Sequence, residues 1–147
     1  MKTERWVLLA DDDENDILFL QRAFKLAEIG QMLRVVNDGQ AVIEYLLGSG
    51  NFADRKEHPL PDLLILDLKM PRKTGLEVLD WLRHHEPMRT LPVIMLSSSV
   101  YPSDIQKAYQ LGTNAYITKP SGTAQRNELV KLIKGFWLGF NEVPQIS

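Results

Sequence analysis

Short apolar runs alternate with helical patterns along the chain, and this alternation limits the possible folds more than any other feature of the sequence. Predominantly apolar runs occupy residues 6–10, 32–36, 63–66, 93–96 and 115–117, and all except 32–36, which contains Arg34, are unbroken, as is typical of strands buried on both faces. Apolar residues at helical spacing follow each run, in residues 17–27, 41–46, 76–82, 105–111 and 129–140. Five successive β–α units predict a five-stranded parallel sheet between two layers of helices, which is a doubly wound α/β/α sandwich.

Glycines and turn residues mark the ends of several predicted elements. Gly30 and Gly112 follow helical patterns, at positions where a helix is expected to stop. Residues 48–61 are polar, contain glycines and prolines, and are long for a connection inside a compact domain. The chain of 147 residues has the length of one well-cored domain, and we expect no second one.

Composition excludes several classes of function. The 19 acidic and 17 basic residues give a net charge of −2, whereas nucleic-acid binding needs a clustered surplus of bases, so we expect no nucleic-acid partner. The chain contains no cysteine, which excludes disulfides, thiolate metal sites and a cysteine nucleophile. No apolar run approaches the roughly 20 residues of a membrane span, and the first residues do not form a signal peptide. We therefore expect a cytoplasmic domain without a membrane partner.

Charged and polar side chains stand at the ends of four predicted strands. They are Asp11, Asp12 and Asp13 after the first strand, Asp67 after the third, Ser97 after the fourth and Lys119 after the fifth. Ligands of doubly wound folds bind at this edge of the sheet. Clustered carboxylates favour Mg²⁺, a carboxylate can become an acyl phosphate, and an ammonium group can neutralise the transferring phosphoryl group. Each residue alone is commonly a cap, a turn or a solvated loop residue, and Asp13 is expected to cap the next helix. Their conjunction indicates phosphoryl transfer.

These residues lie in segments that resemble the receiver domains of two-component response regulators, from about Arg5 to Lys134. The matching segments are residues 7–12, 64–75, 92–98 and 115–120. The resemblance implies a flavodoxin-like receiver fold and a phosphoacceptor signalling protein rather than an enzyme with a separate substrate. It also implies that a sensor histidine kinase supplies the phosphoryl group, which then switches protein–protein interactions.

The resemblance implies a metal site and an acceptor. Asp67 takes the position of the phosphoacceptor. Asp67 also takes the position of a Mg²⁺ ligand, and other divalent cations can substitute for Mg²⁺. Asp12 matches the direct metal ligand, and Asp11 the residue that holds the metal through water. Lys69 matches the residue whose backbone carbonyl binds the metal.

The resemblance also implies a switch. Ser97 matches the hydroxyl residue that moves toward the phosphoryl group, and Lys119 matches the lysine that pairs with it. Tyr116 matches the aromatic residue that rotates inward when the hydroxyl moves. Pro120 follows Lys119, where the family favours a cis peptide bond, which proline tolerates.

Two departures from a minimal receiver resemble the small regulators paired with bacterial and cyanobacterial phytochrome histidine kinases. They are the long segment 48–61 and the continuation past the usual last helix. This finer resemblance implies a light-linked kinase and a homodimer. The dimer would use the face of the fourth helix, fifth strand and last helix, together with a C-terminal arm. We therefore divide the chain into a receiver domain, residues 1–135, and an aromatic arm, residues 136–147.

The arm has two interpretations. Trp137, Leu138 and Phe140 exceed the apolar residues that the last helix needs to cover the sheet. They either cap the domain's own core or pack on a partner subunit, because large aromatic residues favour interface cores. Ile146 is a further candidate for the arm.

Two other classes of function fit the sequence less well. A Mg²⁺-dependent phosphatase with an aspartate nucleophile commonly carries a second acid two residues later, where this chain has Lys69. A flavodoxin-like cofactor binder needs a phosphate-cradling loop after the first strand. Asp11, Asp12 and Asp13 would repel a phosphate at that place unless a metal were bound.

Overall fold

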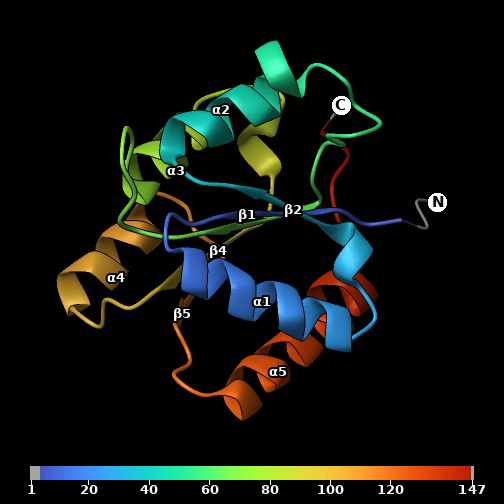
Figure 1. The fold of residues 1–147 in the computed structure, drawn as a ribbon. Coiled ribbons are helices and arrows are strands. Elements are labelled where there is room, and N and C mark those ends of the chain that lie inside the picture. The colour runs from blue at the N-terminus through green and yellow to red at the C-terminus, as the bar shows by residue number, and fades with distance from the viewer. Residues whose placement is uncertain (1–3, 147) are drawn as a thin grey trace.

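The computed structural model describes residues 4–146 and contains one five-stranded, all-parallel sheet. The strands are β1 (Val7–Ala10), β2 (Leu33–Val36), β3 (Leu63–Leu66), β4 (Val93–Ser97) and β5 (Ala115–Thr118). Their order in the sheet is β2-β1-β3-β4-β5 (Figure 1). This order places β3 at the centre of the sheet, and the carboxyl end of β1 lies beside that of β3. The doubly wound parallel sheet predicted from the sequence is confirmed.

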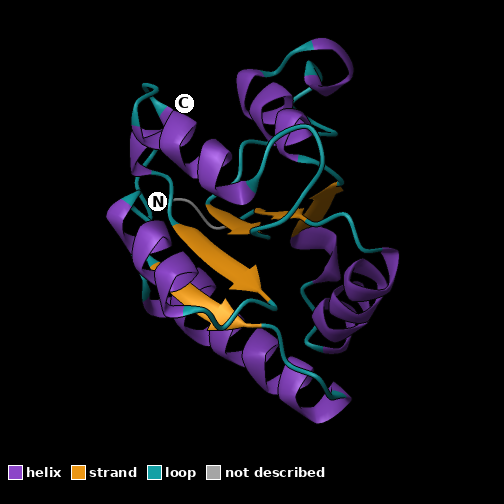
Figure 2. Cartoon of the chain, turned by 90° about the vertical axis from the view of Figure 1, so that its left-hand side faces the viewer, coloured by secondary structure: helices purple, strands orange, loops and turns teal. Residues whose placement is uncertain are grey.

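Helices cover both faces of this sheet and form the outer layers of the sandwich (Figure 2). They are α1 (Glu14–Leu26), α2 (Gly39–Leu47), α3 (Gly75–Arg83), α4 (Pro102–Gln110) and α5 (Thr123–Leu132), which continues into a π-helix (Ile133–Phe140). Three short 3₁₀ helices lie at Gly30–Met32, Gly50–Phe52 and Met88–Thr90. None of the helices in residues 4–146 is long and apolar enough to cross a membrane.

The two faces of the sheet bury separate apolar clusters. Leu8 and Leu64 point toward α2, α3 and α4, whereas Leu9 and Ile65 point toward α1 and α5. All four side chains are at most 1% exposed. Burial on both faces explains why these strands are continuous apolar runs instead of alternating ones, since each buried side chain of this size contributes about 1.5–3 kcal/mol.

Local capping fixes the helices next to the sheet edge. Asp13 caps α1, because its carboxylate accepts hydrogen bonds from the backbone N–H groups of Asn15 and Asp16 at 2.9 and 3.1 Å. The predicted cap is therefore confirmed. Gly112, with φ of +104°, follows α4 as expected. The predicted stop at Gly30 is wrong: α1 ends at Leu26, and Glu28 takes the left-handed conformation with φ of +64°.

The long segment before β3 is held against α2. The Arg55 guanidinium donates to the carbonyls of Tyr45 and Leu46, which lie in the last turn of that helix. The Tyr45 hydroxyl donates to the Pro59 carbonyl at 2.9 Å, and the Tyr45 ring packs against Phe52. The extra length of residues 48–61 therefore forms a structured cover over one end of α2.

The C-terminal residues cover the domain's own core in part. Trp137 and Leu138 pack against the cluster between the sheet, α1 and α5. The chain then crosses to the opposite side of the sheet (Figure 1), where Ile146 is buried in the other cluster and only 5% exposed. Phe136 and Phe140 remain 52% and 88% exposed. Trp137 and Leu138 thus cap the domain's own core, whereas the exposed Phe136 and Phe140 remain free to pack on a partner subunit. Ile146 belongs to the core.

One backbone expectation is wrong. The Lys119–Pro120 peptide bond is not cis, and the cis bond among the described residues is Glu86–Pro87.

Candidate functional site

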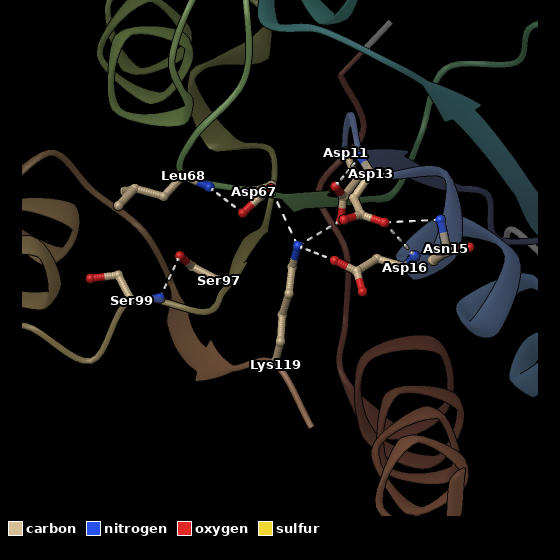
Figure 3. A network of polar contacts seen from close by, with 9 residues as sticks. All are labelled: Asp11, Asp13, Asn15, Asp16, Asp67, Leu68, Ser97, Ser99 and Lys119. Atoms are coloured by element: carbon tan, nitrogen blue, oxygen red, sulfur yellow. Dashed lines mark hydrogen bonds and ion pairs between the residues drawn. The ribbon is translucent and has the colours of Figure 1, made fainter. Parts of the chain in front are cut away.

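Residues predicted from the strand ends lie at one edge of the sheet, and Figure 3 shows Asp67, Ser97 and Lys119 among them. Ala10 of β1 pairs with Leu66 of β3, so the residues that follow them, Asp11 and Asp67, lie next to each other. The backbone N–H of Asp67 donates to the Ala10 carbonyl at 3.0 Å. Asp11 and Asp67 are buried, at 1% and 7% exposure, because neighbouring strands and helices surround these strand ends.

Three carboxylates form a cluster suited to a hard cation. Oxygen atoms of Asp11, Asp12 and Asp67 lie within 4.8 Å of one another. Asp12 is exposed, whereas Asp11 and Asp67 are buried. A set of carboxylate oxygens is the donor set that Mg²⁺ and Mn²⁺ prefer, so these residues fit a divalent ion.

Lys119 is the cation of this site. Its ammonium group lies 2.9 Å from Asp11, 2.8 Å from Asp16 and 3.3 Å from Asp67, measured from Nζ to a carboxylate oxygen in each case. Burial acts to lower the pKa of Lys119, but the hydrogen bonds to Asp16 and Asp11 and the charges of Asp67 and Asp11 outweigh it. The pKa is raised, and the group is fully charged at neutral pH.

Asp16 belongs to this site, although the strand ends did not predict it. It lies in the first turn of α1, on the helix that starts directly after the Asp13 cap. That turn returns the side chain to the sheet edge. The sequence signal that could have indicated Asp16 is its spacing, because it lies one helical turn after the acidic residues at the end of β1.

Asp67 is buried, and each of its carboxylate oxygens has a hydrogen-bond partner. One of its oxygens, Oδ1, accepts a hydrogen bond from the Leu68 N–H at 2.8 Å, and the other, Oδ2, faces Lys119. Burial, helped by the Asp11 charge, raises the pKa of Asp67 to about 6 against the opposing effect of Lys119. Asp67 is therefore mainly ionised at neutral pH and is available as a nucleophile.

The loop after Asp67 is held close to it by Gly75. The Gly75 N–H donates to the Leu68 carbonyl at 2.8 Å. A Cβ atom at this position would lie 2.1 Å from the Asp67 carbonyl oxygen. Lys69, in the same loop, has an exposed side chain, which leaves the predicted role of its backbone unaffected.

The hydroxyl residue and the aromatic residue meet at the loop after β4. Ser97 Oγ accepts from the Ser99 N–H at 3.1 Å, and Ser99 Oγ donates to Asp104 at 2.6 Å. The Tyr116 hydroxyl donates to the Ser99 carbonyl at 2.9 Å. Tyr116 thus already contacts the loop that carries Ser97, and the two residues are linked through Ser99.

The fold and this site define a phosphoacceptor signalling domain, and the chain belongs to the response regulator receiver domain family, which it matches over residues 7–134. It is a response regulator receiver, and receiver domains bind Mg²⁺ and related divalent cations.

Three relatives are informative. The response regulator Rcp1 of Synechocystis is 31% identical over 94% of this chain and 92% of that protein, and its Mn²⁺-bound structure superimposes with a TM-score of 0.84. The phosphorylated cyanobacterial phytochrome response regulator RcpA is 33% identical, with a TM-score of 0.88 over 97% of this chain and all of that one. RPA3017, from red light signaling of R. palustris, is 39% identical, with a TM-score of 0.89 over 96% of this chain and 99% of that one.

Proposed function

We propose that Asp67 accepts a phosphoryl group from a phosphohistidine, with a divalent ion held by Asp11, Asp12, Asp67 and the Lys69 carbonyl. The observation that supports this most strongly is the approach of Lys119 to 3.3 Å from the Asp67 carboxylate, beside two further acids. An Asp67 oxygen attacks phosphorus, the P–N bond breaks, and the histidine leaves as imidazole after taking up a proton. The bound ion supplies charge neutralisation for the phosphoryl oxygens.

The proposed output is a change of binding surface rather than catalysis on another molecule. Lys119 pairs with the phosphoryl group, and Ser97 releases the Ser99 N–H to donate its hydroxyl proton to a phosphoryl oxygen. Because Tyr116 is bonded to Ser99, movement of this loop is transmitted to the surface of α4 and β5. The protein acts in the cytoplasm in this proposal, where ATP-dependent kinases form the phosphohistidine.

Replacing Asp12 with alanine tests the metal site. We expect Mg²⁺ affinity to fall roughly tenfold or more. Removing a residue that only hydrogen-bonds to a metal ligand typically lowers metal affinity about 10–100-fold, and removing a ligand itself should cost at least as much. Asp12 is exposed, so the fold should be unaffected. Isothermal titration calorimetry with Mg²⁺ measures the change. The matched control is Asp13→Asn, since asparagine also caps a helix. Unchanged affinity in Asp12→Ala would argue against the ligand role.

The phosphodonor we propose is a phytochrome-type sensor histidine kinase. The support comes from relatives: RcpA is described as a phytochrome response regulator, and RPA3017 as part of red light signaling. Phosphotransfer from a panel of purified histidine kinases of the source organism tests this. Preferential transfer from a kinase without a chromophore-binding domain would exclude it.

We propose a homodimer in which the receiver, residues 1–135, pairs through the α4–β5–α5 face and the arm, residues 136–147. Residues 1–3 and 147 of these ranges lie outside the described part of the chain. The supporting observation is the exposure of Phe136 and Phe140, which α5 and its continuation place on the surface. Aromatic residues of this size favour interfaces.

Phe136→Ser combined with Phe140→Ser tests the dimer without removing the buried Ile146. We expect the sedimenting species to shift from dimer to monomer, while the unfolding midpoint stays close to that of the wild type, because both rings are exposed. Leu47→Ser, a change at an exposed apolar residue of α2 outside the proposed face, is the control. An unaltered dimer mass in the double variant would rule out the arm as the contact.

A further inference from the structure

Asp16 makes the shortest of the three contacts with the Lys119 ammonium group. The Nζ atom lies 2.8 Å from Asp16 Oδ2 and 3.3 Å from Asp67 Oδ2 (Figure 3). An ammonium group has three protons, and three carboxylates, including that of Asp11 at 2.9 Å, share them in this site. The positive charge of Lys119 is therefore shared among three carboxylates and does not neutralise Asp67 alone.

The position of Asp16 is fixed by the helix. Its backbone N–H donates to the Asp13 cap at 3.1 Å, which places it in the first turn of α1. Arg126 lines the same small cleft as Asp16 and Lys119, but its guanidinium lies over the Phe19 ring, 4.4 Å from the centroid. Within residues 4–146, Lys119 is thus the cation that Asp16 contacts.

We propose that Asp16 is a positioning residue that draws the Lys119 ammonium toward α1 and weakens its attraction for a phosphoryl group on Asp67. This inference rests on the proposed function of Asp67. Asp16 also adds a fourth negative charge to a site that already holds Asp11, Asp12 and Asp67. A fixed anion beside the lysine attracts a metal cation and repels a phosphoryl dianion. Asp16 therefore sets the balance between metal affinity and phosphoryl affinity.

Asp16→Asn distinguishes this role from structural support, because it removes the charge while keeping an oxygen that accepts a hydrogen bond. We expect affinity for the beryllium fluoride complex, which mimics a phosphoryl group on a carboxylate, to rise roughly threefold to tenfold. We expect Mg²⁺ affinity to fall roughly twofold to fivefold in the same protein. The two affinities change in opposite directions, whereas a distorted site would lose both.

The experiment is calorimetric titration at low ionic strength, first with Mg²⁺ alone and then with beryllium fluoride at saturating Mg²⁺. Glu14→Gln is the matched control, because it removes an exposed charge from the same turn of α1, and both of its affinities should stay within about twofold of the wild type. Asp16→Glu restores the charge and should return both affinities toward wild-type values.

Each result has one meaning. Opposite changes in Asp16→Asn, with Glu14→Gln unchanged, support the inference. Weakening of both ligands would identify Asp16 as a structural support, and two unchanged affinities would show that its charge does not act on the site; either result overturns the inference. If wild-type protein bound no beryllium fluoride, or if Asp67→Asn bound it equally well, the proposed function itself would fail, and the inference with it.

Discussion

Asp67→Asn is expected to reduce Mg²⁺-dependent labelling by acetyl phosphate at least a hundredfold. The amide is not a nucleophile at neutral pH and forms no acyl phosphate, while it keeps the size of the side chain. The substitution also removes one of the three carboxylates that would hold the metal. Labelling is measured by intact-protein mass after incubation with acetyl phosphate and Mg²⁺, where the phosphoryl group adds its mass and acetate leaves.

Asp13→Asn is the control for this measurement, because Asp13 lies beside the site but serves as the α1 cap. Its labelling should match that of the wild type, since asparagine caps helices as well as aspartate does. If Asp67→Asn were labelled to the wild-type extent, another residue would be the acceptor and the assignment would be wrong.

Gly75→Ala is expected to lower the free energy of unfolding by about 3 kcal/mol or more. The new Cβ would lie 2.1 Å from the Asp67 carbonyl oxygen, and backbone cannot yield as a flexible side chain can. The loop after β3 must therefore move, and Asp67 with it. We expect labelling at Asp67 to fall in whatever fraction of this variant folds. Urea unfolding followed by circular dichroism measures the stability.

Gly135→Ala provides the comparison, because a Cβ at that position meets nothing within 4 Å. Alanine is also favoured over glycine in helices by up to about 1 kcal/mol, so this variant should be as stable as the wild type or slightly more so. Wild-type stability in Gly75→Ala would show that the loop adjusts without cost and that it does not hold Asp67 in place.

The sequence was sufficient for the fold because hydrophobic pattern and turn signals agree in most of the chain. The continuous apolar run at residues 63–66 became β3 with the same bounds, and the helical pattern of residues 76–82 lies within α3 (Gly75–Arg83). The error at Gly30 has a local cause. Glu28 adopts a left-handed conformation two residues before the glycine, and single residues in this conformation are not restricted to glycine.

The site residues that follow directly on strands could be predicted from the sequence. The contacts that depend on how side chains of a helix pack beside the sheet could not. Asp11 and Asp67 were brought together by the pairing of β1 with β3, which follows from topology. The contact between Asp16 and Lys119 joins residues 103 positions apart and depends on how α1 packs beside the end of β5. The burial of Ile146 likewise depends on the path of the chain after α5, which no periodicity specifies.

Asp67 is expected to carry an acyl phosphate, and reductive trapping locates such a group at a single residue. Wild-type protein is incubated with acetyl phosphate and Mg²⁺, reduced with sodium borohydride, which converts an aspartyl phosphate into homoserine, and mapped by tandem mass spectrometry. Homoserine is expected at position 67, and none is expected when Mg²⁺ is replaced by a chelator. Homoserine at another aspartate, or its formation at position 67 regardless of Mg²⁺, would contradict this expectation.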